Sequence, residues 1–174
     1  LSATQIERLE NPDTKGATPD SAGVFRCWDG TLLYEKTAEA AETCDFLVVY
    51  VHWGSENTDE LDWAQKDQAL KLAQSGADLI IGDHSHCLQG IDVVEGVPVF
   101  YSLGNFLFSS KTLDTCLVKA VVEDGRISGL QFLPAMQKGC RTFLLAGEEK
   151  ERVLEYMRSI SNNVTIDQDG YITY

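Results

Sequence analysis

The residues best suited to catalysis or metal binding are the three histidines, and each of them follows an apolar run. His52 stands where the run 46–51 ends, and His84 and His86 follow the run 77–81 in the sequence Gly-Asp-His-Ser-His. Neutral imidazoles suit zinc, iron or manganese far better than calcium or magnesium. The spacing therefore predicts a site for one divalent transition metal ion or two adjacent ions. The alternative is that each histidine caps a strand end by hydrogen bonding to a loop carbonyl.

The elements around these histidines form a strand–helix–strand unit. Asp45–Val51 ends in a short run with no polar alternation, as expected of a strand buried on both faces. A helix is predicted over Asp62–Gln74, and the run Ala77–Ile81 is the second strand. A connection of this length returns a parallel strand, so both histidine-bearing turns leave the sheet at its carboxyl edge. Ligands of open α/β sheets bind at that edge.

Other polar and aromatic residues lie near the histidines in sequence. Glu56 is a candidate metal ligand, partner of an imidazole or acid–base group, or it is simply solvated. Asp83 is expected to face solvent or to cap its turn. Asn105 either donates an amide hydrogen bond to a substrate oxygen or shapes the turn after Gly104. Trp53 and Phe106 either line a cleft or belong to the core.

The composition limits the class of protein. The 174 residues are enough for one domain, and the formal net charge of −13 disfavours nucleic acid or an anionic membrane surface as a partner. No Gly-x-Ser-x-Gly elbow is present, which argues against a serine hydrolase. The cysteines are odd in number, lack a Cys-x-x-Cys pair and are expected to be small buried hydrophobic residues, with Cys87 as one further possible ligand. They are Cys27, Cys44, Cys87, Cys116 and Cys140.

The rest of the chain changes from alternating units to successive strands. No apolar run is long enough to span a membrane, and the chain opens without Met inside what resembles an element. We therefore expect an upstream part, with any targeting segment, to precede Leu1. Asp124-Gly125 between two β-rich runs is a strong hairpin signal. The further predictions are a strand remnant at 1–6, a surface loop at 7–22, an extended piece at 24–28, a helix at 31–43, a hairpin of 90–94 with 97–102, a hairpin of 115–123 with 126–133, a helix at 148–160 and a β-like tail at 164–173.

Three sequence blocks together resemble one known family. They are His-Trp-Gly-Ser-Glu at 52–56, Gly-Asp-His-Ser-His at 82–86 and Tyr-Ser-Leu-Gly-Asn-Phe at 101–106. In this order they resemble the bacterial capsule-synthesis proteins of the CapA type, which are associated with poly-γ-glutamate capsule formation and are similar in fold to calcineurin-like metallophosphatases. The resemblance implies an α/β metallophosphatase-like α/β/β/α sandwich, represented by its carboxyl-terminal half. Residues 1–174 would then form a single domain whose amino-terminal portion lies upstream.

The resemblance also implies a ligand set. His52 and His84 would bind one metal ion and His86 a second, with manganese, iron or zinc as the candidate ions. The remaining ligands of such a dinuclear site would lie before Leu1. Two residues depart from the family pattern, because Asp83 stands where members often have His and Ser85 where they often have Pro.

The implied function is a metal-dependent phosphoesterase-like hydrolase with Glu56 and Asn105 as catalytic candidates. The alternative is a non-catalytic or weakly catalytic component of capsule polymer assembly or export. The expected partners are a capsule polymer or phosphoester substrate and other capsule synthesis proteins, with no nucleic acid. By resemblance, the protein works outside the cytoplasm at the bacterial cell surface, anchored to the membrane by a segment outside this chain.

Overall fold

A five-stranded sheet forms the centre of the protein, of which the computed structural model describes residues 1–6 and 16–174. Neighbouring strands are parallel from one edge through β5, and β4 closes the other edge antiparallel to β5. Across the sheet the strands are β1 (Ser2–Thr4), β2 (Val48–His52), β3 (Leu79–Asp83), β5 (Val97–Phe100) and β4 (Ile91–Val94). The predicted amino-terminal strand and the hairpin over 90–102 are thus confirmed.

Helix α2, Trp63–Gln74, connects β2 to β3 and begins with a capping box. The Asp62 carboxylate accepts a hydrogen bond from the Gln65 backbone N–H at 2.8 Å, and the Gln65 amide oxygen accepts one from the Asp62 backbone N–H at 3.2 Å. These bonds satisfy donors that the first turn of a helix leaves unpaired. The parallel β2–α2–β3 unit confirms the predicted crossover and brings the carboxyl ends of both strands to one edge.

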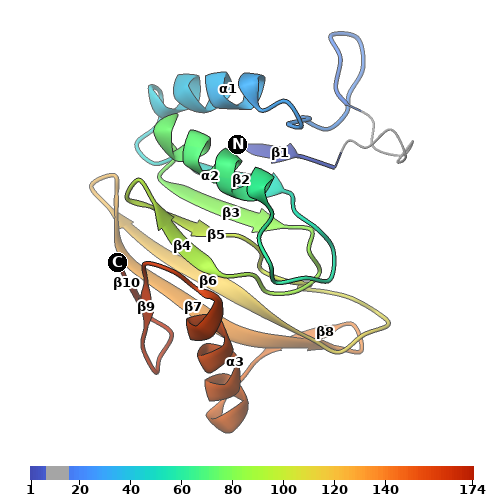
Figure 1. Ribbon diagram of the computed structural model, residues 1–174, viewed down its shortest axis with the longest axis vertical. Helices are drawn as coiled ribbons and strands as arrows, with labels where there is room; N and C mark the ends of the chain where they lie inside the picture. The colour runs from blue at the N-terminus through green and yellow to red at the C-terminus, as the bar shows by residue number, and fades with distance from the viewer. Residues whose placement is uncertain (7–15) are drawn as a thin grey trace.

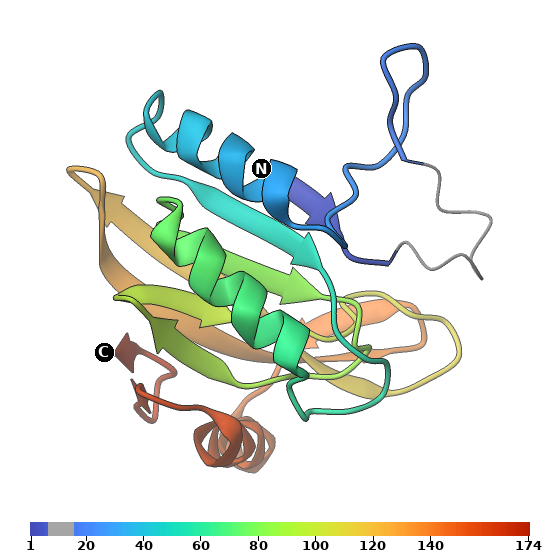
Figure 2. The ribbon, with the colours of Figure 1, turned by 45° about the horizontal axis from the view of Figure 1, so that its top comes forward.

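Two helices cover one face of the sheet. Helix α1, Thr31–Ala41, and helix α2 lie across that face in Figure 2. Leu33 from α1 and Leu72 from α2 pack in one buried cluster with Val49 and Val51 of β2. Because side chains alternate along a strand, the next residues of β2 point to the opposite face. This alternation decides which side of the sheet each candidate site residue occupies.

The opposite face of the sheet packs against the carboxyl-terminal elements, which Figure 1 shows below it. Phe132 and Leu154 share a buried cluster there with Ile81 of β3. The order of layers is therefore helices, five-stranded sheet and three-stranded sheet, and the residues that follow helix α3 hydrogen-bond to Ile91 at the β4 edge of the five-stranded sheet. The elements on this side are β6 (Leu113–Glu123), β7 (Arg126–Lys138), β8 (Arg141–Leu144), α3 (Gly147–Ile160), β9 (Thr165–Ile166) and β10 (Ile172–Thr173).

Strands β6 and β7 form the hairpin predicted from Asp124-Gly125. Both turn residues have positive φ, 49° and 71°, as a two-residue turn with the twist of the strands requires. Strand β8 has no counterpart among the predicted elements. It follows a turn at Gly139-Cys140, where Cys140 has a φ of 58°. Cysteine is not a residue that signals this conformation, so the pattern gave no indication of a hairpin.

Strand β2 differs from its prediction. Val49 and Val51 are fully buried, but Val48 and Tyr50 are 38% and 37% exposed. The expectation that this strand is buried on both faces is therefore wrong, whereas Leu79–Gly82 of β3 are buried throughout as expected of an inner strand. An apolar run fixes the presence of a strand, but its neighbours decide how much of each face they cover.

The remaining predicted elements match within a few residues. Helix α1 ends two residues before its predicted end at Thr43, and α3 begins one residue before its predicted start. The tail is the β9–β10 pair. The extended piece over 24–28 forms isolated bridges, among them Thr4 with Arg26. The predicted surface loop lies partly outside the described residues, and its described part pairs Thr18 with Ser21.

Candidate metal centre

The two strand ends place the histidines side by side. His52 is the last residue of β2, and it pairs in register with Asp83, the last residue of β3. His84 and His86 follow β3 directly. Gly82 and Asp83 therefore belong to the strand and not to the turn, which corrects the sequence interpretation of Gly-Asp as turn residues. Parallel pairing thus brings all three imidazoles to the carboxyl edge of the sheet.

Asp83 holds the His52 ring. Its Oδ1 lies 2.7 Å from His52 Nδ1, and its Oδ2 accepts a hydrogen bond from the Tyr50 hydroxyl at 3.0 Å. The expectation that Asp83 faces solvent or caps a turn is therefore wrong. A carboxylate that accepts the Nδ1 proton leaves Nε2 of the neutral imidazole with its lone pair, and this is how metal-binding histidines are commonly oriented. Tyr50 was not among the sequence candidates, although its place two residues before His52 puts it on the same face.

His84 is the inner member of the cluster. Its Nδ1 lies 2.9 Å from His52 Nε2, and its Nε2 lies 4.0 Å from Glu56 Oε1. Burial, assisted by the neighbouring His52, lowers the pKa of His84 below the ordinary value for histidine, so its imidazole is neutral at neutral pH. A metal ligand must be deprotonated in this way. Glu56 thus lies next to the cluster, and its role as a ligand, imidazole partner or acid–base group stays a prediction.

The turn that carries His84 and His86 has an unusual backbone. His84 has a φ of 94° and His86 a φ of 59°, a region that side chains other than glycine rarely adopt. The turn is held by Ser85, whose side chain is buried and donates to the Cys87 carbonyl at 2.8 Å, and whose own carbonyl accepts from the Asn57 N–H at 2.7 Å. Such strain persists only where the surroundings fix it, and it is frequent at functional sites.

His86 has a partner of its own. Its Nδ1 lies 2.8 Å from Asn105 Oδ1, and its ring centroid lies 6.0 Å from that of His84. The Asn105 Nδ2 atom is buried and has no hydrogen-bond partner among the described residues. Asn105 therefore does more than shape a turn, because it fixes one histidine and keeps an unused donor beside it. An unpaired buried donor is costly, so it marks a place where an acceptor is missing.

Three further candidates lie elsewhere. Trp53 is fully buried, and its Nε1 donates to the Tyr101 carbonyl at 2.9 Å, so it belongs to the core. Phe106 is exposed. The Cys87 thiol donates to the Thr58 carbonyl at 3.1 Å, and burial raises the pKa of that thiol, which keeps it in the form that does not bind metals.

The other cysteines follow the prediction only in part. Cys27 and Cys116 are buried, as expected of small hydrophobic residues. Cys44 and Cys140 are exposed, so the expectation of burial is wrong for these two. Both lie in connections between elements, where spacing along the sequence gives no information on burial.

Comparison with known proteins gives the family of the chain. Residues 2–110 match the family described as "Bacterial capsule synthesis protein PGA_cap". The chain belongs to this family. The match includes every residue of the histidine cluster and excludes β6 to β10 and α3. The bacterial capsule synthesis family therefore shares the part of the fold that carries the candidate chemistry.

Two relatives are themselves capsule proteins. The PGA biosynthesis protein CapA of Bacillus subtilis (strain 168) is 37% identical over 94 residues, which are 52% of this chain and 25% of that protein. The capsule biosynthesis protein CapA of Bacillus anthracis is 35% identical over 113 residues, which are 63% of this chain and 28% of that protein. The chain spans about a quarter of the length of the curated relatives it matches.

The described part of this family member does not bring the candidate ligands together as one metal-enclosing group. Across residues 1–6 and 16–174, no group of three or more His, Cys, Asp or Glu side chains is arranged to enclose a metal ion. His52 and His84 converge as a pair, and His86 stands beside them with a different partner. Within the same residues, no helix is both long and apolar enough to cross a membrane.

Proposed function

We propose that this chain is a metal-dependent phosphoesterase-like hydrolase domain of the capsule synthesis family. The observation that carries the proposal is the pair of imidazole nitrogens, His52 Nε2 and His84 Nδ1, 2.9 Å apart at the carboxyl edge of a parallel sheet. A mixed α/β fold, in which a mainly parallel sheet has helices on one face and antiparallel strands on the other, supports the proposal of a calcineurin-like metallophosphatase fold. In this proposal residues 1–174 form one domain, and the ions are divalent manganese, iron or zinc, for which imidazole is a suitable ligand.

The residues present fit part of a dinuclear centre. His52 and His84 would hold one ion, and His86, with its Nδ1 fixed by Asn105, would hold the second through Nε2. Hydrolytic dinuclear centres also use carboxylate ligands, and the described residues offer Glu56 at 4.0 Å from His84. We infer that the remaining ligands come from segments of the relatives' sequences that this chain does not match.

The chain's own residues would prepare the site for hydrolysis of a phosphoester. Divalent ions held by His52, His84 and His86 would supply polarisation of the phosphoryl oxygen and a lower pKa of a bound water molecule. Asp83 would fix the orientation and tautomer of His52, and the buried Asn105 N–H, which has no partner among the described residues, would donate to a substrate oxygen. Glu56, which is exposed and 4.0 Å from His84, would accept or return a proton.

A metal titration tests the proposal. The 174-residue chain is titrated with Mn²⁺ and Zn²⁺ and compared with the double variant His84→Ala/His86→Ala. We expect saturable binding that the double variant loses. The matched control is Asp124→Ala, because Asp124 also has a positive φ but lies in the distant β6–β7 turn. Circular dichroism checks that all variants are folded, and equal binding in the chain and the double variant would contradict the proposal.

A second candidate function is a non-catalytic component of capsule polymer assembly or export. The observation that favours it is the lack, among the described residues, of a complete group of metal ligands. In either case we propose that the protein works at the bacterial cell surface, with capsule polymer and other capsule synthesis proteins as its partners. Absence of bound metal at every concentration tested, with a folded chain, would favour the component over the hydrolase.

A further inference from the structure

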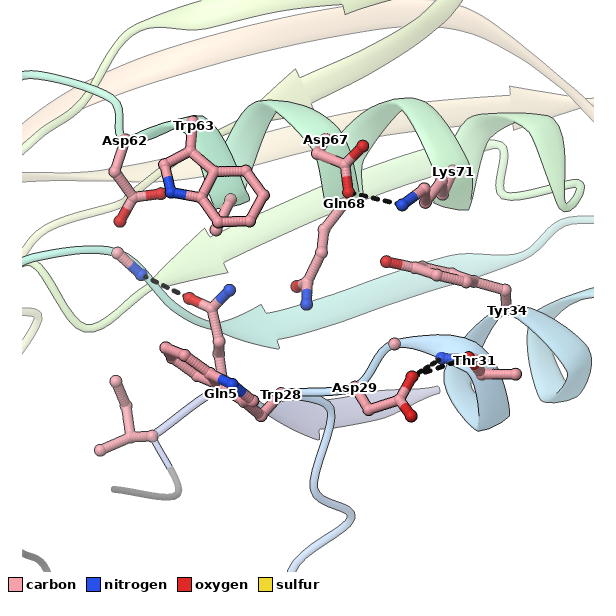
Figure 3. Close-up of a pocket in the computed structure, with 14 residues that line it drawn as sticks. Gln5, Trp28, Asp29, Thr31, Tyr34, Asp62, Trp63, Asp67, Gln68 and Lys71 are labelled. Atoms are coloured by element: carbon pink, nitrogen blue, oxygen red, sulfur yellow. Dashed lines mark hydrogen bonds and ion pairs between the residues drawn. The ribbon is translucent and has the colours of Figure 1, made fainter. Parts of the chain in front are cut away.

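A cavity opens at the carboxyl edge of the sheet, between the start of α1 and the start of α2. It has a volume of about 490 Å³ and reaches Gln5 after β1 and Gly54 after β2. Figure 3 shows Trp28 beside Gln5 and Trp63 at the beginning of α2, with Tyr34 on the α1 side. Aromatic side chains therefore border it from α1, from α2 and from the segment that precedes α1.

This cavity and the histidine cluster lie on opposite faces of the sheet. Along β2, Val49 and Val51 point into the core beneath α1 and α2, whereas Tyr50 and His52 point to the other side. The cavity is lined by residues of α1 and α2, on the helix side. A ligand bound here would thus not contact the imidazoles, so this cavity is a separate site.

The lining is rich in negative charge. Among the described residues that line the cavity, Asp29, Asp62 and Asp67 are acidic and Lys71 is the basic one. Lys71 is already engaged, because its Nζ lies 2.6 Å from Asp67 Oδ2 and 5.8 Å from the centroid of the Tyr34 ring. An anionic ligand would meet two carboxylates with no free cation to offset them. A cationic ligand would find carboxylates and aromatic faces, the same kind of contact that Lys71 makes.

One buried side chain in the lining lacks a partner. Gln68 is 4% exposed, and its Nε2 donates to the Cys27 carbonyl at 2.7 Å. Its Oε1 is buried and has no hydrogen-bond partner among the described residues. Figure 3 shows this amide extending from α2 into the space between Gln5 and Tyr34. A buried acceptor without a donor is costly, so the site is prepared for a ligand that brings an N–H or O–H group.

The exposed tryptophans supply the apolar part of the site. Trp63 is 78% exposed and Trp28 is 62% exposed, although tryptophan is usually buried for most of its surface. Large aromatic faces at the mouth of a polar cavity bind ligands with one apolar side, and they attract cations through the ring quadrupole. Two such faces, two carboxylates and one orphaned acceptor together define the chemistry of the occupant.

We propose that this cavity binds a ligand that carries a primary ammonium group on an apolar body. Amino sugars and alkyl amines share this chemistry. The ammonium group donates to the Gln68 Oε1 atom and neutralises Asp29 and Asp62, and the apolar body lies against Trp28 and Trp63. The site takes no part in metal binding, so this proposal does not depend on the proposed hydrolase and is tested separately.

Three probes with the same ring isolate the charge of the ligand. Cyclohexylamine, cyclohexanol and cyclohexanecarboxylate are titrated against the 174-residue chain at neutral pH, with binding followed by saturation-transfer NMR. We expect cyclohexylamine to bind about 2–5-fold more tightly than cyclohexanol, the factor expected from a single exposed cation–π contact, and the carboxylate not to bind. Glucosamine and cadaverine then distinguish an amino sugar from an alkyl amine.

Variants locate the binding to the cavity. Trp63→Ala removes an exposed ring, and Asp29→Asn removes a charge while keeping the oxygen that accepts from Thr31 at 3.1 Å. Each should weaken cyclohexylamine binding about 2–5-fold. The matched controls are Tyr174→Ala, an exposed ring at the chain end, and Asp124→Asn, an exposed aspartate in a turn. Equal binding of the alcohol and the amine, binding of the carboxylate, or equal losses in the control variants would overturn the proposal.

Discussion

The parallel half of the protein, residues 1–110, and the antiparallel half, residues 111–174, differ in role. The first carries the candidate sites, and the second contributes buried packing beneath them. The parallel half carries the histidine cluster and the candidate ammonium site, each at the carboxyl edge of its sheet. The antiparallel half contributes long strands and a helix that bury Phe132 and Leu154 against Ile81 of β3. The family match stops at residue 110, so the half with the candidate chemistry is the half shared with other capsule synthesis proteins.

The two halves keep the histidine cluster rigid in different ways. In the parallel half the functional side chains hold one another, as Tyr50, Asp83, His52 and His84 do in one continuous chain of contacts. The antiparallel half supports that chain from below through apolar packing. Substitutions in the core of the antiparallel half should therefore lower stability without changing metal affinity. Substitutions in the histidine cluster of the parallel half should lower metal affinity without changing stability.

The largest effect is expected in the core of the antiparallel half. Phe132→Ala removes a ring that is 1% exposed and should lower the free energy of unfolding by about 3–5 kcal/mol, because it leaves a cavity beneath the central sheet. Urea denaturation measures the loss. Phe143→Ala, at an exposed ring of β8, is the control and should change stability by less than about 0.5 kcal/mol. Similar losses in both variants would mean that the antiparallel half does not form the supporting core.

The next largest effect is a loss of metal affinity, expected in the histidine cluster of the parallel half. Asp83→Asn keeps the shape of the side chain but removes the charge that orients His52, so metal affinity of the chain should fall about 10–100-fold. Isothermal titration calorimetry with Mn²⁺ or Zn²⁺ measures it. Asp78→Asn is the matched control, because Asp78 precedes the same strand at the opposite edge and accepts from the Leu47 N–H at 2.7 Å. If metal affinity fell in Asp78→Asn but not in Asp83→Asn, the proposed role of Asp83 would be refuted.

Sequence patterns were sufficient for most of the elements and for the meeting of the histidines. The βαβ rule placed His52 and His84 at one edge because it needs only element order and connection length. It does not give the register, and the register is what makes Asp83 the neighbour of His52. Without the register, the sequence predicts only that Asp83 faces solvent or caps its turn.

The missed features depend on contacts between distant segments. The ammonium site combines residues after β1 with residues of α1 and α2, and no motif joins Trp28 to Trp63 along the sequence. A possible signal was the sequence Leu-Asp-Trp at 61–63, which puts a large aromatic residue at the exposed first turn of a capped helix. Patterns of local sequence identify such a residue but not the surface that it faces.

The smallest effect on stability is expected in the turn of the β6–β7 hairpin. Asp124 has a φ of 49°, a conformation that costs alanine about 1 kcal/mol more than glycine. Asp124→Ala should therefore be less stable than Asp124→Gly by about that amount in urea denaturation, while both bind metal as the unmodified chain does. A change in metal affinity from this turn would show that the two halves are coupled, because the turn would then act on the histidines through the shared core. Equal stability of the two variants would show that the turn relaxes out of its left-handed conformation, and the strands alone would then set the register of the hairpin.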